Sequence, residues 1–282
     1  MKKHLNVLAT SFAVIILLSS CSMSGTKSDT KNRLWNVNIN AEIPVLPVLN
    51  IDGTPNSEGR NSYAILWEST DTMEVFAKGE SLDTICPATI NASLTAINAV
   101  VQGAFAVGDT IELFLPQGDI DYTGQDGTEA LTLSKYFFAD GMFIINKADE
   151  QSSLLSTRDS IMNPKQAFVA FTFCDESAKP VTISKLTIRS ESGHLAVHGG
   201  SNQSALQYDE LVVNAATPSA QLFVAIRNKL HDRSFADYYD PEADVADSYT
   251  LTALSADGAT YTASWKARLL YGNVYVAEIM LN

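Results

Sequence analysis

The stretch "LWNVNINAEI", residues 34–43, places apolar and polar side chains at alternating positions. Successive side chains of a β-strand point to opposite faces of a sheet, so a period of two is typical of a strand with one buried face. Trp35, Val37 and Ile39 would share the buried face. The stretch therefore predicts a half-buried β-strand near the start of the folded chain.

The same period recurs along the rest of the chain. Further strands are expected at residues 63–68, 110–116, 142–147, 167–173, 181–190, 220–227, 249–254, 260–269 and 273–281. Many short strands separated by Gly, Asn, Asp and Pro predict an all-β protein of β-sandwich architecture. The last two strands are expected to form a hairpin across residues 270–272, and a helical turn is expected only within 89–101 and 128–139.

One polar stretch divides the predicted strands into two groups. With 282 residues, 46% of them hydrophobic, the chain is long enough for one or two cores. Residues 146–165, "NKADEQSSLLSTRDSIMNPK", read as a linker. We therefore expect an N-terminal β-sandwich domain at 34–160 and a C-terminal one at 161–282.

The N-terminus has the features of an export signal. A basic start at residues 2–4 precedes a short apolar run at 7–18, which is too short to span a membrane comfortably. The run ends in Leu18-Ser19-Ser20-Cys21, which resembles the lipobox of bacterial lipoproteins. Residues 1–20 are therefore expected to be a lipoprotein signal peptide, with lipidation on Cys21; an ordinary signal peptide is the alternative.

The anchor and the charge limit the partners that this chain can have. Acyl chains on Cys21 would bind a lipid membrane, and the small polar residues 21–33 would form a flexible tether. The formal net charge is −13 and the pI is about 4.6. A chain this acidic repels phosphate backbones, so nucleic acid is not an expected partner.

The two remaining cysteines, Cys86 and Cys174, leave two alternatives open. An exported protein lies in a compartment that permits a disulfide between them. Two separate buried thiols are the other reading, because the sequence does not give their distance.

An acidic, Gly-containing stretch at residues 119–131, "DIDYTGQDGTEAL", comes close to a calcium loop. Its first, third, fifth and sixth positions fit an EF-hand pattern, but the twelfth, which should be a bidentate Glu, is Ala130. The stretch also follows a predicted strand and not a helix. We therefore expect a strand connection here and no metal site.

Other catalytic and ligand-binding patterns are weak. His194 and His198 are four residues apart, but their surroundings alternate like a strand, which would separate them along one face. No G-x-S-x-G elbow and no phosphate-binding Gly loop occur in the sequence. The chain is expected to be no enzyme and to need no cofactor. Tyr238 and Tyr239, beside acidic residues, could stack on a sugar or could be packing residues.

Three motifs follow the lipobox in order along the chain. Residues 64–76 contain a W-x-x-x-D pattern. Residues 261–281 contain the last two predicted strands. Between them, residues 113–141 carry a strand ending in Pro, then Q-x-G-T and Y-x-x-A, at Pro116, Gln125, Gly127, Thr128, Tyr136 and Ala139. Together these motifs resemble the fimbrillin family, the Mfa-like and FimA-like pilin lipoproteins of Bacteroidetes, although the first lacks the Gly that usually precedes the Asp.

The resemblance implies a fold, a location and a mode of assembly. It implies two tandem transthyretin-like β-sandwich domains, display as an outer-membrane lipoprotein at the cell surface, and assembly with other fimbrial subunits by strand exchange. An Arg-specific protease would cut after an Arg that follows the first strand. Arg60 ends the loop after that strand and is the expected processing site, with Arg33 as the runner-up. A strand of another subunit would then take the vacated place.

The role within a fimbria stays open between stalk, tip, anchor and accessory subunit. The closing strand ends one residue before Asn282, so either the last strand itself is the donor strand or there is none, which counts against a stalk subunit. The alternative function is a stand-alone surface lipoprotein that binds a host glycan or protein, with Tyr238 and Tyr239 as ligand contacts.

Overall fold

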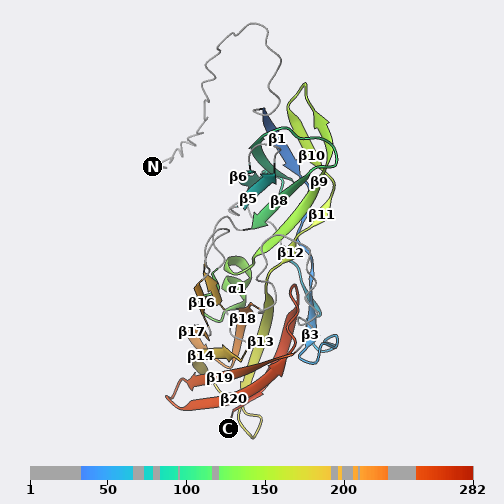
Figure 1. The fold of residues 1–282 in the computed structure, drawn as a ribbon. Coiled ribbons are helices and arrows are strands. Elements are labelled where there is room, and N and C mark those ends of the chain that lie inside the picture. Colours follow the sequence, from blue (N-terminus) through green and yellow to red (C-terminus); the bar gives the residue numbers. More distant parts are fainter. Residues whose placement is uncertain are drawn as a thin grey trace, which may run out of the picture.

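The computed structural model describes residues 33–65, 73–78, 83–94, 96–115, 121–191, 196–198, 206–208, 210–227 and 246–281. These residues form strands and one short helix, which confirms the all-β prediction. Figure 1 shows two groups of strands stacked along one long axis, with β1 in the upper group and β20 at the far end of the lower one.

The first group is an eight-stranded sheet with two short strands beside it. Its strands are β1 (Leu34–Ile39), β5 (Met73–Lys78), β6 (Asp83–Ile90), β7 (Ile97–Gln102), β8 (Thr110–Leu115), β9 (Ala139–Asp149), β10 (Leu154–Thr157) and β12 (Asn163–Pro164). The two short strands, β2 (Ala41–Glu42) and β11 (Ser160–Ile161), pair in parallel.

This sheet closes on itself, which corrects the expectation of a sandwich in this part of the chain. The strand order is β10-β1-β7-β6-β5-β8-β9-β12, and β10 also pairs with β9. The ring from β10 to β9, called the barrel from here on, therefore leaves none of its own strands as an edge. The alternating apolar side chains of its strands fill the interior. A transthyretin-like strand order stays a prediction.

The second group consists of two facing sheets. The five-stranded sheet contains β18 (Gln221–Ile226), β13 (Ala167–Cys174), β21 (Val274–Met280), β3 (Leu46–Asn50) and β4 (Ser62–Tyr63) in that order. The four-stranded sheet contains β17 (Glu210–Ser219), β14 (Ile183–Ser190), β19 (Asp247–Ser255) and β20 (Thr260–Ala267). A two-stranded sheet of β15 (Ala196–His198) and β16 (Leu206–Tyr208) lies beside them.

The two large sheets of this group pack face to face through aromatic side chains. Phe171 of the five-stranded sheet meets Trp265 of the four-stranded sheet edge to face, with ring centroids 5.3 Å apart. Trp265 also packs on Tyr249, at 4.9 Å. The predicted hairpin at the C-terminus is wrong, because β20 pairs with β19 while β21 pairs with β13 and β3. The intervening residues cross from one sheet to the other.

Short elements also differ from expectation. The helix α1 (Glu129–Lys135) lies within the predicted range, whereas residues 89–101 end β6 and begin β7. Residues 146–165, expected as a linker, contain β10, β11 and β12. The division of the chain near residue 160 stays a prediction; the pairings do place β3 and β4, from the first part of the sequence, in the five-stranded sheet.

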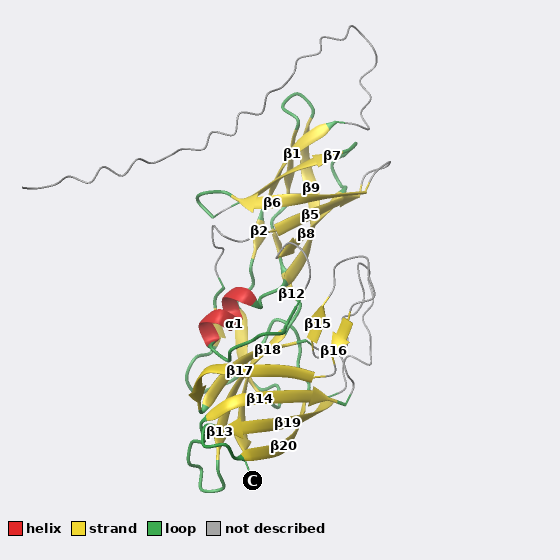
Figure 2. Ribbon diagram, turned by 90° about the vertical axis from the view of Figure 1, so that its left-hand side faces the viewer, coloured by secondary structure: helices red, strands yellow, loops and turns green. Residues whose placement is uncertain are grey.

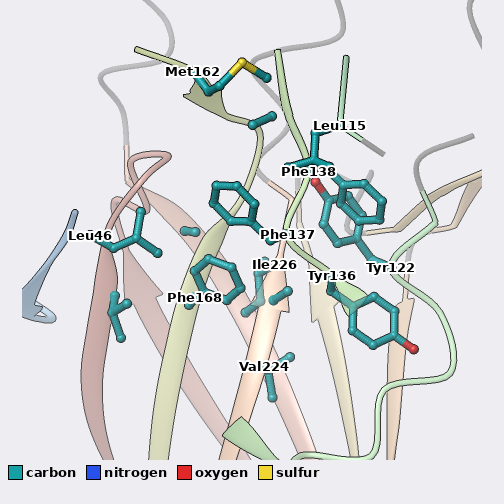
Figure 3. Packing of buried hydrophobic residues seen from close by; sticks show 14 of the residues in the cluster. Leu46, Leu115, Tyr122, Tyr136, Phe137, Phe138, Met162, Phe168, Val224 and Ile226 are labelled. Atoms are coloured by element: carbon teal, nitrogen blue, oxygen red, sulfur yellow. The ribbon is translucent and has the colours of Figure 1, made fainter. Parts of the chain in front are cut away.

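A single hydrophobic core runs from the barrel into the second group. Figure 3 shows the junction between them, where Phe137 and Phe138 precede β9 and lie among buried side chains of both groups. Phe138 meets Tyr122 edge to face at 4.9 Å, and the Tyr122 hydroxyl donates to the carbonyl of Lys165 at 3.0 Å. This packing links the end of the barrel to the start of β13.

Candidate functional site

The predicted first strand, β1, is an inner strand of the barrel. Its apolar side chains on one face point inward: Trp35 is 3% exposed, Val37 1% and Ile39 0%. Burying a side chain of this size contributes about 1.5–3 kcal/mol to stability. Removal of β1 would therefore uncover a groove lined by apolar side chains.

The backbone of β1 is paired on both sides. It runs antiparallel to β7, from Leu34 opposite Gln102 to Ile39 opposite Ile97, and parallel to β10, with Asn36 opposite Leu154. The peptide groups of β7 and β10 that face β1 would lose their partners if β1 left. A groove with two open strand edges accepts an extended peptide through main-chain hydrogen bonds.

Side chains hold the beginning of β1 in place. The indole Nε1 of Trp35 donates to the carbonyl of Gly103 at 2.8 Å. The guanidinium of Arg33 lies over the Trp35 ring, 4.6 Å from its centroid, and donates to Ser153 Oγ from Nη2 at 3.2 Å. Arg33 also forms an ion pair with Glu150 at 3.5 Å. These contacts fix the register in which β1 enters the barrel.

The same segment continues into the five-stranded sheet. β3 runs parallel to β21, with Val48 opposite Val274, and antiparallel to the two residues of β4. Its Leu46 and Val48 are buried. One continuous segment, residues 34–50, therefore completes both the barrel and the second group.

The loop that follows, residues 51–61, is almost wholly exposed. Local bonds shape its turns: the amide of Thr54 donates to Asp52 Oδ1 at 2.9 Å, and the amide of Glu58 donates to Asn56 Oδ1 at 3.1 Å. Backbone bonds tie the loop to the neighbouring strand β3, at Val48 and Asn50. Exposed loops that are held mainly by local bonds are preferred sites of proteolytic cutting.

Arg60 lies at the end of this loop and is held by α1. Its Nη1 donates to Glu129 Oε1 at 2.8 Å, and its Cζ lies 4.3 Å from the centroid of the Tyr63 ring. The Tyr63 hydroxyl donates to Glu129 Oε2 at 3.2 Å. The hydrogen bond that Arg60 donates to Glu129 raises the pKa of Arg60, and burial raises the pKa of Tyr63. We call Arg60, Tyr63 and Glu129 the arginine clamp.

The two predicted processing arginines differ in access. The side chain of Arg60 is 56% exposed, whereas that of Arg33 is 23% exposed and contacts Trp35, Ser153 and Glu150. Sequence reasoning named Arg60 but missed Tyr63 and Glu129. Glu129 lies 69 residues further along the chain, so no local sequence pattern indicates that it contacts Arg60.

The stretch at residues 121–131 closes the side of the second group. The amide of Gln125 bonds the backbone of Ala225 like a strand: Oε1 accepts from its N–H at 2.7 Å and Nε2 donates to its carbonyl at 2.8 Å. Gly127 O accepts from the amide of Phe223 at 2.8 Å, also in β18. The carbonyls of Gln125 and Asp126 accept from amides of β17 at 3.2 Å.

Residues 125–127 therefore bridge the edges of β18 and β17. This is a structural role for the stretch that resembles a calcium loop. Among the residues that the structure describes, no group of three or more His, Cys, Asp or Glu side chains gathers as metal ligands. Asp119, at the start of the stretch, lies outside the described residues.

Cys86 and Cys174 are free thiols, so the structure contains two separate cysteines and not the disulfide. Cys86 lies in β6 of the barrel and Cys174 at the end of β13, in different sheets. Burial raises the pKa of both thiols. Neither thiol is placed to act on the other.

Several predicted residues lie outside the described part of the chain. These are the signal peptide at 1–20, Cys21, the tether up to residue 32, His194, Tyr238 and Tyr239. The lipidation and ligand-contact predictions therefore stay predictions. No helix in the described ranges has the length and apolar character to cross a bilayer.

Comparison with known proteins gives similarity at the level of structure. No protein-family model matches the sequence. No curated protein matches it either. The structure is similar to that of a candidate cell adhesion protein from Bacteroides ovatus ATCC 8483, with 14% identity, a TM-score of 0.44, and coverage of 89% of this chain and 95% of the other.

Two further solved structures have comparable coverage. One is a candidate cell adhesion protein from Bacteroides uniformis ATCC 8492, with 12% identity, a TM-score of 0.44, and coverage of 84% of this chain and 93% of the other. The other is the tip fimbrial protein Mfa3 from Porphyromonas gingivalis with C-terminal truncation. It has 7% identity, a TM-score of 0.39, and coverage of 88% of this chain and 95% of the other.

Proposed function

We propose that this chain is a non-enzymatic, fimbrillin-like subunit of a cell-surface fimbria that assembles by strand exchange. In this proposal acylated Cys21 anchors the precursor in the outer membrane, and an Arg-specific protease cuts after Arg60. Residues 21–60, with the acylated Cys21, then leave, and a strand of another subunit replaces β1. The sequence resemblance and the geometry of residues 34–60 support this mechanism.

One observation carries the proposal: β1 is an inner strand, paired on both sides, and an exposed arginine follows it in a loop. An inner strand that can be cut off leaves a ready-made acceptor groove, with apolar pockets at alternate positions and unpaired peptide groups along both walls. The buried positions of β1, namely Trp35, Val37 and Ile39, define which side chains of the donor must be apolar.

Removal of this segment would also leave a second empty strand position, in the five-stranded sheet. β3 leaves with the same cut, which exposes the edge of β21 that now pairs with Val48 to Asn50. A donor strand long enough to follow the old path would bridge both groups of strands. Head-to-tail contacts of this kind propagate as a filament, because each subunit gives a strand and receives one.

The test is limited proteolysis of the chain from residue 22 onward, which contains every described residue. An Arg-specific protease is added, the new N-terminus is read by mass spectrometry, and size is followed by light scattering. Cleavage after Arg60, loss of residues 22–60 and growth of filaments are expected. Arg60→Gln should block all three, and Arg33→Gln should leave them intact.

Other outcomes discriminate between roles. Cleavage after Arg60 without growth would indicate a capping or accessory subunit. A chain that resists cutting at Arg60 and stays unassembled contradicts processing-driven assembly. In that case, tight glycan binding by the uncut chain, lost in Tyr238→Ala, would favour the stand-alone binding lipoprotein.

A further inference from the structure

β20 is an edge strand of eight residues with regular pairing. It is the last strand of the four-stranded sheet and pairs with β19 without a register shift from Thr260 to Ala267. In the described ranges no strand pairs with its other side. Figure 2 shows it as the lowest strand, at the end of the molecule away from the barrel. Such an edge presents a row of backbone donors and acceptors to a partner strand.

At the opposite side of the second group, the edges of β17 and β18 are covered. There, residues 125–127 bond to the backbone of both β18 and β17 and close the gap between the sheets. Edge strands are usually also blunted by Pro, by a bulge, by short length or by charged side chains, especially Lys. β20 contains no Pro and its pairing with β19 shows no bulge, and Lys266 is its only charged residue.

We propose that the β20 edge is an interface between two copies of this chain, in which the two β20 strands pair antiparallel about a two-fold axis. Two four-stranded sheets would then join into one continuous sheet. A contact of this type is isologous, so the strand must be complementary to itself. The sequence of β20 meets this condition in a register centred on Ala263.

On the core-facing side, this register makes two aromatic pairs. Tyr261 of one copy lies opposite Trp265 of the other, and Ala263 lies opposite itself. Tyr261 is half-buried and Trp265 is 9% exposed. The indole N–H of Trp265 is buried and has no acceptor among the described residues. Tyr261 of the second copy would bring a hydroxyl to this face, and aromatic cross-strand pairs stabilise antiparallel sheets.

On the outer side, the same register avoids like charges. Thr262 lies opposite Ser264, and Thr260 lies opposite Lys266. Beyond the strand, Arg268 of one copy faces the turn of the other copy that contains Asp257. Both of these charged residues are exposed. The edge therefore combines opposite charges at its ends with short polar side chains in its middle.

The test is sedimentation velocity of the chain from residue 22 onward over a series of concentrations. A reversible monomer–dimer equilibrium is expected. In Thr262→Lys with Ser264→Lys, two pairs of lysines meet across the axis, which should raise the dissociation constant by at least about tenfold. The substitutions make an acidic protein less charged, so a general charge effect would act in the opposite direction.

A second variant tests the register. Thr262→Lys with Ser264→Asp places an opposite charge across each pair and should tighten the dimer. A register centred on residue 264 would instead set the introduced aspartate against its own copy, and the introduced lysine against the native Lys266. That arrangement would weaken the dimer.

Thermal unfolding checks that both variants fold. The proposal is overturned if the chain stays monomeric, or if the paired lysines leave the dissociation constant of the dimer unchanged. Neither result depends on processing at Arg60, so this interface and the proposed function can fail separately.

Discussion

Glu129, the first residue of α1, accepts a 2.8 Å bond from Arg60, which lies 69 residues earlier in the chain. The other carboxylate oxygen of Glu129 accepts a hydrogen bond from the hydroxyl of Tyr63, and the guanidinium of Arg60 lies over the Tyr63 ring. An Arg-specific protease must bind the Arg60 side chain in its own specificity pocket. It therefore has to break the arginine clamp before it can cut.

We predict that Glu129→Gln speeds cleavage after Arg60. Both side chains are about half exposed, so solvent screens the ion pair and its loss should raise the specific rate by only about two- to fivefold. The measurement is kcat/KM for the appearance of the cut chain. Glu150→Gln, which removes the partner of Arg33, is the matched control and should leave the rate at Arg60 unchanged.

An unchanged rate in Glu129→Gln would show that the clamp opens too easily to matter. It would leave the proposal of processing at Arg60 intact, since that depends on Arg60→Gln. A rise of similar size in both Glu129→Gln and Glu150→Gln would mean that general loss of stability, and not release of Arg60, controls the rate.

Gly127→Ala should destabilise the fold more than Gly53→Ala. Both glycines have positive φ, +76° and +83°, so both substitutions carry backbone strain of about 1–2 kcal/mol. A Cβ at residue 127 would also lie 2.6 Å from Leu222 Cδ2, while at residue 53 it would meet nothing within 4 Å. Chemical denaturation should show a further loss of about 1–3 kcal/mol for Gly127→Ala. Equal losses would contradict the bridging role of residues 125–127.

Alkaline pH should unfold the protein through its buried tyrosines. Burial raises the pKa of Tyr122 and Tyr249. A raised folded-state pKa gives stability that is complete below the unfolded value of about 10 and is lost as pH rises above it. Each such tyrosine should lower the free energy of unfolding by about 1.4 kcal/mol per pH unit there.

Denaturant titrations below and above this pH measure the slope. Tyr122→Phe should weaken the protein at neutral pH, because the bond to the Lys165 carbonyl is lost, but should make the alkaline slope shallower. A slope that is the same in the variant would show that Tyr122 does not stay protonated in the folded state.

The free thiols give a prediction about reactivity. With Cys21 excluded, the chain from residue 22 onward should bind two equivalents of a thiol reagent when unfolded, at Cys86 and Cys174. In the folded state both should react slowly, because burial raises the pKa of each and the thiolate is the reactive form. Cys86 should react first, since it is half-buried and Cys174 is 5% exposed. Mass spectrometry after alkylation would detect a disulfide as a missing pair of adducts.

The period-two pattern predicted the strands well where one face is buried. β1, β8, β13, β14 and β19 lie within or close to their predicted ranges. β10 was missed because its buried Leu155 and Thr157 lie in a polar stretch that reads as a linker. β3 was missed because Pro47 and the turn residues after it indicate a loop.

Pairing was harder to predict than position. Alternation shows which face of a strand is buried but not which strand lies beside it, so the wrong hairpin of β20 and β21 was the natural reading of two neighbouring strands. Likewise, the sequence around Gln125 gives no sign of Ala225, its partner 100 residues away. Arg60 could be named from its place after a strand, whereas its clamp depends on tertiary packing.

The direction of β1 has a mechanical consequence. A cell-surface anchor at Cys21 would pull on the chain just before Leu34, along the axis of β1. The bonds to β7 lie across that axis, so they bear such a load together and cannot open one after another. Traction along the tether is then resisted by the whole strand at once, while a single cut in the loop at residues 51–61 breaks the covalent link between β1 and the strands that follow the loop. The same strand thus resists being pulled out, yet one proteolytic cut separates it from the rest of the chain.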